Sequence, residues 1–178
     1  PEIQFVLDRE ADCSVALNAM REGKLPLRVT HNDTKLNNVL MDEATGEGVC
    51  IIDLDTVMPG LVIYDFGDSI RFGANHCAED ETDLSKVSLD VDLFSVYTAA
   101  FLEGTGGSLT NEEIAYLPWG AKLMTLECGI RFLTDYLAGD EYFHISREKH
   151  NLDRCRTQFK MEARWAELEA IVRQYQKL

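Results

Sequence analysis

The stretch from residue 27 to residue 55 constrains the fold of this chain more than any other. It reads LRVTHNDTKLNNVLMDEATGEGVCIIDLD. Short apolar runs of the kind that form β-strands alternate in it with clusters of His, Asp and Asn. Such clusters are a poor choice for a core, because every buried polar group must find a hydrogen-bond partner. The pattern therefore indicates a site at the ends of short strands, of a kind that suits a metal ion and a phosphate.

Three extended segments and a turn are predicted in and after this stretch. Residues 27–30 form a strand that leads into the polar loop His31-Asn32-Asp33. Residues 38–53 form a hairpin whose turn is rich in glycine and acidic residues. Its second strand contains four consecutive apolar residues, Val49–Ile52, and we expect it to be buried on both faces. Met58-Pro59-Gly60 is predicted to be a turn.

The rest of the chain is predicted to be mainly helical, which gives an α+β fold that is mainly α. Apolar spacing predicts helices over residues 2–22, 64–72 and 89–102. Thr110 with Glu113 is a capping-box signature for a further helix, which Gly139 is expected to close. Pro118 either breaks or kinks this helix, or it starts another. A last helix is expected from about residue 148 to the C terminus. Six of its residues are expected to face inward: Leu152, Cys155, Phe159, Ala163, Ala166 and Ala170.

Length and composition limit the class of protein. The chain has 178 residues with 46% apolar and 27% charged residues, which is typical of one globular domain. The net charge of −14 argues against a nucleic-acid partner, because binding to phosphate backbones needs a basic surface. No apolar run is long enough to span a membrane, and the N-terminal residues do not resemble a signal peptide. The five cysteines form no CxxC pair, so a reducing, cytoplasmic location is expected.

The polar clusters contain the residue types that phosphoryl transfer requires. In that reaction a carboxylate orients or deprotonates the attacking hydroxyl, and Mg²⁺ held by oxygen ligands neutralises the phosphates. Asp33 can supply the carboxylate, while Asn38 and Asp53 can supply metal ligands that the hairpin brings together. Lys35 can place a cation near the transferring group. Each residue alone is compatible with a structural role, but the ordered set favours chemistry.

Three motifs in order carry a resemblance to a known superfamily. Residues 31–38, HNDTKLNN, match the HxDxxxxN catalytic loop of protein-kinase-like enzymes. Residues 51–55, IIDLD, resemble the metal-binding motif of the aminoglycoside phosphotransferase and choline kinase superfamily, and residues 64–66, YDF, are similar to its Tyr-Asp-Leu. Over its whole length the chain most resembles the C-terminal lobe of bacterial N-acetylhexosamine 1-kinases. In this resemblance His31 and Asp65 are expected to brace the catalytic loop by hydrogen bonds.

The resemblance implies a role for each matching residue. Asp33 is the expected catalytic base. Asn38 and Asp53 are the expected Mg²⁺ ligands, which hold the ATP that serves as co-substrate. Lys35 is expected to contact the transferred phosphate, although many small-molecule kinases of the superfamily have another residue there.

The resemblance also implies residues that hold the acceptor. Asp55 is expected to bind a second metal or a hydroxyl of the substrate. In sugar 1-kinases an Arg and a Tyr from the C-terminal helices hold the sugar, and Arg131 and Tyr142 match them. Two alternatives stay open: Arg131 can form a surface ion-pair ladder with Glu127 and Asp135, and Tyr142 can pack against the last helix.

One part of the superfamily is not found in this sequence. There is no glycine-rich nucleotide-covering loop and no strand lysine with a helix glutamate, and the glycines of residues 104–107 follow the catalytic motifs. The chain starts at a proline without a methionine, as a fragment would. We therefore expect residues 1–178 to be a single domain, the C-terminal lobe of a kinase-like phosphotransferase whose N-terminal lobe is absent. On its own it is expected to bind ATP weakly and to catalyse poorly.

The predicted reaction is ATP- and Mg²⁺-dependent phosphoryl transfer to the anomeric hydroxyl of an N-acetylhexosamine. The motifs predict the type of reaction better than they predict the acceptor. One alternative is another small-molecule kinase, acting on choline or ethanolamine, homoserine or an aminoglycoside. A second alternative is a non-catalytic, pseudokinase-like nucleotide-binding module.

Overall fold

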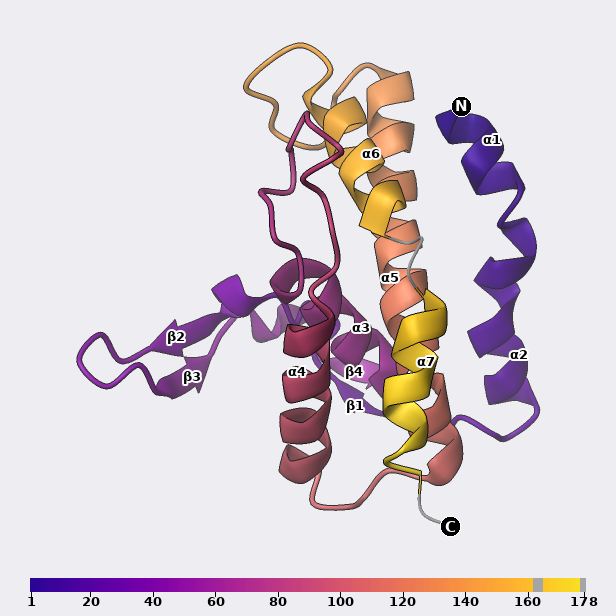
Figure 1. Cartoon of the computed structure of the whole chain (residues 1–178), viewed down its shortest axis with the longest axis vertical. Helices are drawn as coiled ribbons and strands as arrows, with labels where there is room; N and C mark the ends of the chain where they lie inside the picture. Colours follow the sequence, from indigo (N-terminus) through magenta and orange to yellow (C-terminus); the bar gives the residue numbers. More distant parts are fainter. Residues whose placement is uncertain (162–164, 177–178) are drawn as a thin grey trace.

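The structure is a computed structural model that describes residues 1–161 and 165–176. A long helix, α5, lies at its centre, and a β-hairpin projects to one side (Figure 1). The helices are α1 (Glu2–Leu7), α2 (Val15–Arg21), α3 (Val62–Gly73), α4 (Val91–Gly104), α5 (Asn111–Ala138), α6 (His150–Met161) and α7 (Trp165–Arg173). Short 3-10 segments are η1 (Glu10–Ser14), η2 (Leu36–Asn38) and η3 (Leu54–Thr56), and the strands are β1 (Arg28–Thr30), β2 (Val39–Met41), β3 (Gly48–Ile51) and β4 (Met58–Gly60). This mainly helical architecture with small antiparallel sheets confirms the predicted fold class.

The first small sheet pairs β1 with β4, which overturns one prediction. Met58-Pro59-Gly60 is not a turn but strand β4, antiparallel to β1 with Arg28 opposite Gly60. Proline is tolerated because a two-stranded sheet has only edge strands. A Cβ at Gly60 would overlap the Thr30 side chain, so glycine allows the two strands to approach. The sheet holds β1 in place just before the polar loop.

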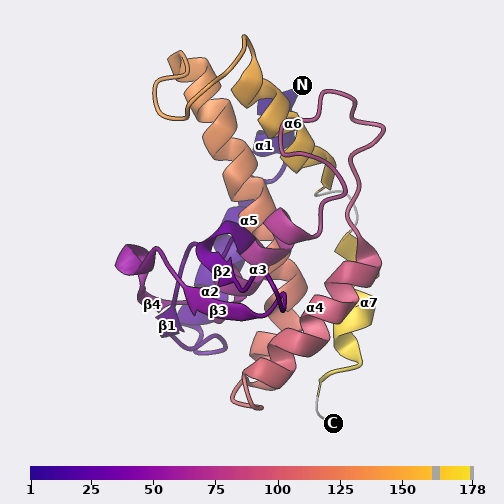
Figure 2. The same cartoon turned by 90° about the vertical axis from the view of Figure 1, so that its left-hand side faces the viewer.

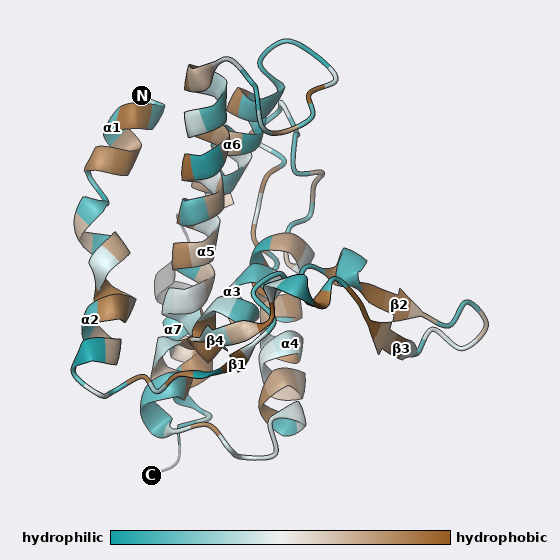
Figure 3. Cartoon of the chain, turned by 180° about the vertical axis from the view of Figure 1, so that it is seen from behind, coloured by the Kyte–Doolittle hydropathy of each residue, from teal (hydrophilic) through white to brown (hydrophobic). Residues whose placement is uncertain are grey.

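The second small sheet is the predicted hairpin, formed by β2 and β3. The prediction that its second strand is buried on both faces is wrong: every residue of β3 is exposed, including Val49 at 63% and Ile51 at 58%. The reason is that the hairpin extends away from the helices (Figure 1). Figure 3 shows that both of its strands are hydrophobic. An apolar surface of this kind on a projecting hairpin is unusual in a protein that acts alone.

The predicted helices at the two ends of the chain are both divided. Residues 2–22 form α1, η1 and α2 rather than one helix, and the last helix is replaced by α6 and α7. Of the residues expected to face inward, Leu152, Cys155 and Phe159 are buried, as predicted, whereas Ala170 is exposed. Ala163 lies outside the described residues, as does the side chain of Ala166. Helix α7 packs beside α4 (Figure 2).

Helix α5 begins and ends as its sequence predicts. Thr110 and Glu113 form the expected capping box, and Gly139 ends the helix with a φ of 105°, which favours glycine. Pro118 neither interrupts the helix nor opens another, because α5 runs through it as one element. Glu113 also binds Arg28 of β1, with nitrogen-to-oxygen distances of 2.6 and 2.7 Å. This ion pair connects the start of α5 to the strand that precedes the polar loop.

The core is built where α3 crosses α5. A Cβ at Gly67 would overlap the backbone of Gly120, and a Cβ at Gly120 would overlap the backbone of Ile63. Two glycines therefore let the helices touch backbone to backbone, and Phe66 and Ile63 are fully buried around the crossing. None of the described helices is long and apolar enough to cross a lipid bilayer. The crossing fixes α3, whose first turn carries Asp65.

Candidate active site

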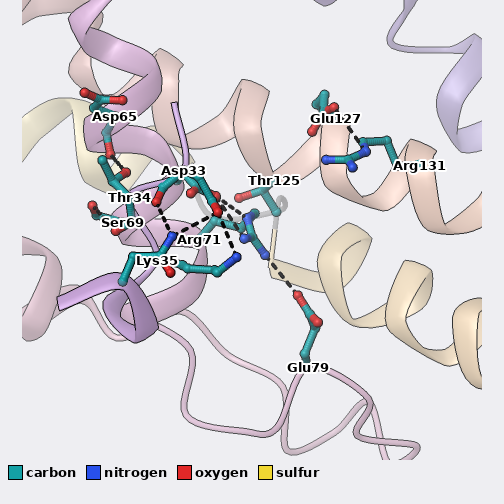
Figure 4. A network of polar contacts seen from close by, with 12 residues as sticks. Asp33, Thr34, Lys35, Asp65, Ser69, Arg71, Glu79, Thr125, Glu127 and Arg131 are labelled. Carbon is teal, nitrogen blue, oxygen red and sulfur yellow. Dashed lines mark hydrogen bonds and ion pairs between the residues drawn. The ribbon is translucent and has the colours of Figure 1, made fainter. Parts of the chain in front are cut away.

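Asp65 attaches the polar loop to helix α3. Its carboxylate accepts hydrogen bonds from the backbone N–H groups of His31 and Asn32, each at 2.8 Å. It lies in the first turn of α3, where the helix dipole favours a negative charge. The loop is thereby joined to helix α3, and Figure 4 shows Thr34 of the loop beside Asp65 of that helix.

His31 links the two ends of the site. Its Nδ1 accepts a hydrogen bond from the N–H of Asp33 at 3.3 Å, so Nε2 carries the proton and donates to the carbonyl of Ile52 at 2.9 Å. Ile52 immediately precedes Asp53. One imidazole ring thus connects the loop to the end of β3. His31 and Asp65 make the bracing contacts expected of them.

The Asp33 carboxylate lies at the centre of the site. Nζ of Lys35 donates to its Oδ2 at 2.8 Å, and Nδ2 of Asn38 donates to the same oxygen at 2.9 Å. Partial burial tends to raise the pKa of Asp33, but the hydrogen bonds from Lys35 and Asn38 outweigh it, so the pKa lies below its usual range. The side chain is 26% exposed. Asp33 is therefore an anion at neutral pH that a substrate hydroxyl can reach.

The side-chain amide of Asn38 lies between Asp33 and Asp53. Nδ2 of Asn38 also donates to the backbone carbonyl of Asp33 at 2.9 Å and lies 3.4 Å from Oδ2 of Asp53. Because three oxygen acceptors surround this atom of Asn38, it must be the NH₂ group, and the amide oxygen points away from them. Asp53 has a φ of 64°, a strained conformation that is concentrated at functional sites. This conformation turns the chain sharply at the end of β3.

The carboxylate of Asp53 is a ligand of the kind that magnesium takes, whereas Asn38 would ligate only with its amide turned over, because its NH₂ group faces Asp53. Mg²⁺ commonly takes one or two protein carboxylates or amides and completes its shell with phosphate oxygens and water. Among the described residues no group of three His, Cys, Asp or Glu side chains could hold a metal by itself. Asp53 would therefore share an ion with a bound nucleotide rather than hold it alone, and Asn38 would join it after turning its amide oxygen towards Asp53. Asp55 is exposed on η3, close in sequence to Asp53 and able to reach solvent or a ligand.

The structure brings Arg131 and Tyr142 together. The Arg131 guanidinium lies 6.0 Å from the centre of the Tyr142 ring and 5.4 Å from that of Phe143, within reach of cation–π attraction. Half of the alternative ion-pair ladder is present, because Glu127 approaches Arg131 at 3.7 Å. Asp135 instead bonds to the backbone of the loop after α5. Tyr142 does not pack against the last helix, since 74% of it is exposed.

The Asp33 cluster lies at the polar loop, whereas Arg131 lies on helix α5. Figure 4 shows Asp33 and Lys35 together at the polar loop, with Glu127 and Arg131 on α5 beyond them. A cavity of about 410 Å³ opens between α3 and α5, and Tyr64, Glu127 and Arg131 are among its lining residues. Its volume is in the range of pockets for small ligands. The cavity is thus lined both by Arg131 and by the residue that precedes Asp65.

Hydroxyl side chains that the sequence reasoning missed complete the loop. Thr56 Oγ1 donates to the carbonyl of His31 at 2.7 Å, and Ser69 Oγ donates to the carbonyl of Thr34 at 3.1 Å. Thr34 Oγ1 in turn donates to the carbonyl of Asp65 at 2.5 Å. Short hydroxyl side chains often bond to nearby backbone groups, and that is the only signal they give in sequence. Their partners here are distant in the chain, so only the fold identifies them.

A family comparison bears on this arrangement. The family model APH, described as phosphotransferase enzyme family, matches residues 4–88, just under half of the chain. The matched stretch runs from α1 to the segment after α3, and it includes Asp33, Asn38, Asp53 and Asp65. The match supports a kinase-like phosphotransferase. ATP as co-substrate and a divalent metal are what such a family implies, and the mainly helical fold is compatible with a kinase-like lobe. Arg131 and Tyr142 lie outside the matched residues.

Proposed function

We propose that this chain is the catalytic large lobe of a sugar 1-kinase, which transfers the γ-phosphoryl group of ATP to the anomeric hydroxyl of an N-acetylhexosamine. The observation that carries the proposal is the grouping of Asp33, Asn38 and Asp53 around one amide nitrogen. The Asp33 carboxylate for the hydroxyl and the Asp53 carboxylate for a metal both lie beside this amide, which supports phosphoryl transfer. The phosphotransferase family match is consistent with this chemistry.

Asp33 acts on the acceptor in this proposal. Its pKa is below the usual range because hydrogen bonds from Lys35 and Asn38 outweigh the effect of partial burial. An anion of low basicity orients the hydroxyl by accepting its hydrogen bond and takes the proton only late in the reaction. Lys35 bonds to Asp33 here, and its flexible ammonium is able to turn towards a phosphate.

Asn38 and Asp53 hold the metal in this proposal. Mg²⁺, when bound, supplies positive charge that neutralises the phosphates as charge moves to the leaving oxygen. The residues themselves would fix where that ion sits: Asp53 follows the segment that His31 anchors, and Asn38, whose NH₂ group bonds to Asp33, would turn its amide oxygen to the ion. Asp55, two residues after Asp53 in the chain, is exposed and is available to a second ion or to a substrate hydroxyl.

A second lobe that covers the nucleotide is part of this proposal. The chain has no glycine-rich loop that could do so. The projecting hairpin supports such a partner, because its apolar residues on both strands are left in solvent, Leu40 at 46% and Val49 at 63% exposed. Apolar surface of this extent is normally covered by another folded unit. We expect the isolated chain to bind ATP weakly for the same reason.

The acceptor site is the second part of the proposal. Arg131 and Tyr142 lie within cation–π distance of each other, and Arg131 also lines the cavity that begins beside Tyr64. A guanidinium and an exposed aromatic ring suit a sugar, because one binds hydroxyl or carbonyl oxygens and the other packs on the apolar face of the ring. The wall of this cavity also includes Glu127, a further acceptor of hydrogen bonds.

Replacing Asp33 tests the proposed reaction. In the enzyme with both lobes, Asp33→Asn should lower sugar-dependent ATP turnover by about 10²–10⁴-fold, the usual contribution of a positioned acid–base group. Asp92→Asn, an exposed acid in the first turn of α4, is the matched control and should stay within about twofold. Turnover of Asp33→Asn within about tenfold of the parent would show that Asp33 is not the base.

Two further measurements separate the alternatives. In an acceptor screen, phosphate on N-acetylglucosamine or N-acetylgalactosamine is the expected result. Phosphate on choline, ethanolamine, homoserine or an aminoglycoside, and none on the sugars, would instead identify another small-molecule kinase. Titration of the isolated chain with Mg·ATP should show weak binding. Tight binding without turnover of any acceptor would favour the pseudokinase-like module.

A further inference from the structure

The loop between α5 and α6 is held by buried side chains rather than left free. Asp135, in the last turns of α5 and only 6% exposed, accepts hydrogen bonds from the N–H groups of Tyr142 at 2.8 Å and Phe143 at 2.9 Å. Gly139 and Asp140 have φ values of 105° and 59°, which turn the chain back towards that carboxylate. One carboxylate therefore caps two successive amides of the loop.

Helix α6 holds the same loop from the other side. Asn151, which is fully buried, donates to Asp135 at 2.9 Å and to Asp140 at 2.8 Å. Its amide oxygen accepts a hydrogen bond from Arg154 at 3.1 Å, and Arg154 also donates to the carbonyl of His144 at 3.2 Å. The polar atoms of Asn151 are thus all engaged, which is what a buried amide needs to be stable.

The anchored loop leaves one large side chain in solvent. Tyr142 is 74% exposed, although the N–H groups of Tyr142 and Phe143 are bonded. Its ring meets that of Phe143 edge to face at 4.8 Å and lies beside Arg131. A cavity of about 430 Å³ opens here, lined by Arg131, Asp135 and Tyr142 among others. An exposed aromatic residue on an immobilised loop beside a cavity has the features of a preorganised binding surface.

We propose that Asp135 is a positioning residue for the acceptor: by capping the loop it holds the Tyr142 ring beside Arg131 in the orientation that the sugar binds. This inference rests on the proposed function, in which Arg131 and Tyr142 contact the acceptor. Asp135 itself contacts neither sugar nor phosphate. Its loss therefore weakens sugar binding by releasing the loop, and it leaves the Asp33 cluster unchanged.

The charge of Asp135 is essential to this role. Burial tends to raise the pKa of Asp135, but hydrogen bonds from the backbone amides and from Asn151 outweigh it, so the pKa lies below its usual range. An ionised carboxylate accepts all three hydrogen bonds at once. Asparagine has the same shape but only one acceptor atom, and its NH₂ group would face a donor. Asp135→Asn therefore disrupts the cap with almost no change in volume.

The test measures sugar affinity rather than stability. In Asp135→Asn the dissociation constant for N-acetylglucosamine, measured by calorimetric titration, should rise about tenfold or more, and amide hydrogen exchange at Tyr142 and Phe143 should become faster. Asp140→Asn is the matched control, because it alters a partner of Asn151 and leaves the cap of Asp135 in place; its affinity should stay within about twofold. The double exchange Asp135→Asn with Asn151→Asp keeps a carboxylate–amide pair between the helices but moves the carboxylate off the loop. It should stay weak.

Each other outcome overturns the inference. Unchanged sugar affinity in Asp135→Asn would do so. Restored affinity in the double exchange would also do so, because it would mean that Asp135 only links the two helices. If Asp135→Asn does not fold, the parent decides: its Tyr142 and Phe143 amides must exchange more slowly than the amide of Glu43 in the exposed hairpin turn, and equal rates overturn the inference. A parent that binds no N-acetylhexosamine refutes the proposed function and this inference together, whereas binding that Asp135→Asn retains refutes the inference alone.

Discussion

The α3–α5 crossing and the β2–β3 hairpin support opposite ends of the same site, and they differ in almost every physical respect. At the crossing two helices touch backbone to backbone through Gly67 and Gly120, and Ile63 is fully buried. On the hairpin, Ile51 is 58% exposed. The crossing carries Asp65 and so holds the loop of Asp33, whereas the hairpin carries the approach to Asp53.

The two halves of the site therefore differ in how completely the structure around them is packed. The base is joined through Asp65 to a packed core in which Ile63 and Phe66 are fully buried. The proposed metal ligand follows a two-stranded hairpin, and an isolated hairpin is marginally stable in water at best. His31 is the main link between them, through its hydrogen bond to the carbonyl of Ile52. We therefore expect the core to determine stability and the hairpin to respond to whatever covers it.

The largest contrast in the free energy of unfolding is expected from an isoleucine-to-alanine substitution made in each region. Ile63→Ala should lower the free energy of unfolding by about 2–5 kcal/mol, because it leaves a cavity in a packed core. Ile51→Ala should change it by no more than about 0.5 kcal/mol, since that side chain is already in solvent. Urea unfolding followed by circular dichroism measures both. Equal losses would mean that the hairpin is packed in solution and that the comparison is wrong.

Two glycine-to-alanine substitutions on the core side, one at a close contact and one in open space, sharpen the comparison. Gly120→Ala should destabilise the fold by about 1–3 kcal/mol, because the new methyl group meets the backbone of Ile63 and backbone cannot move aside. Gly73→Ala, near the end of α3, has no atom within 4 Å of the added Cβ and should be neutral or stabilising by up to about 1 kcal/mol. Thermal unfolding compares the two. A loss at Gly73 as large as that at Gly120 would show that contact with Ile63 is not the cause of the loss, because alanine favours a helix more than glycine does.

The smallest expected effect is a pH dependence on the core side. Burial tends to raise the pKa of Glu113, but the hydrogen bonds from Arg28 and Thr110 outweigh it, so the pKa lies below its usual range. A carboxylate whose pKa is lowered by folding contributes stability above its unfolded pKa, and this stability is lost as the pH falls through the folded value. Glu113→Gln should cost about 1 kcal/mol at pH 7.

The same variant should lose less stability than the parent does below about pH 4.5, the ordinary range of a glutamate. Urea midpoints from pH 7 to pH 3 measure this difference. Ile51→Ala is the reference, because a change on the hairpin should leave the pH profile parallel to that of the parent. A parent profile parallel to that of Glu113→Gln would show that the Arg28 pair does not contribute to acid stability.

The site was predictable where its residues are neighbours in the chain. Asp33, Lys35 and Asn38 lie within six residues, so one loop conformation brings them together, and the structure shows them in contact. The capping box of α5 and the end of that helix at Gly139 were predictable for the same reason, because each depends on a few consecutive residues. The bracing role of Asp65 came from a family motif, since its partners lie more than thirty residues earlier in the chain.

The errors share a different physical cause. Four apolar residues at 49–52 have the composition of a buried strand, but composition does not say whether another element will cover them. Met58–Gly60 contains proline and glycine, as turns do, yet pairing with β1 makes it a strand. Asp135 gave no signal beyond a possible ion pair with Arg131, because the amides that it caps become neighbours only once α5 ends and the chain turns back.

The sequence alone therefore determined the local chemistry: which loop holds an anionic carboxylate, where helices begin and end, and that the fold is mainly helical. These properties depend on residues close together in the chain, whose interactions any fold must satisfy. Tertiary structure decided which apolar segments are buried, how the loop is tied to α3 and β3, and that Arg131 and Tyr142 meet. Those outcomes depend on contacts between distant segments, and such contacts form only when backbone shape, glycine positions and buried hydrogen bonds are satisfied together.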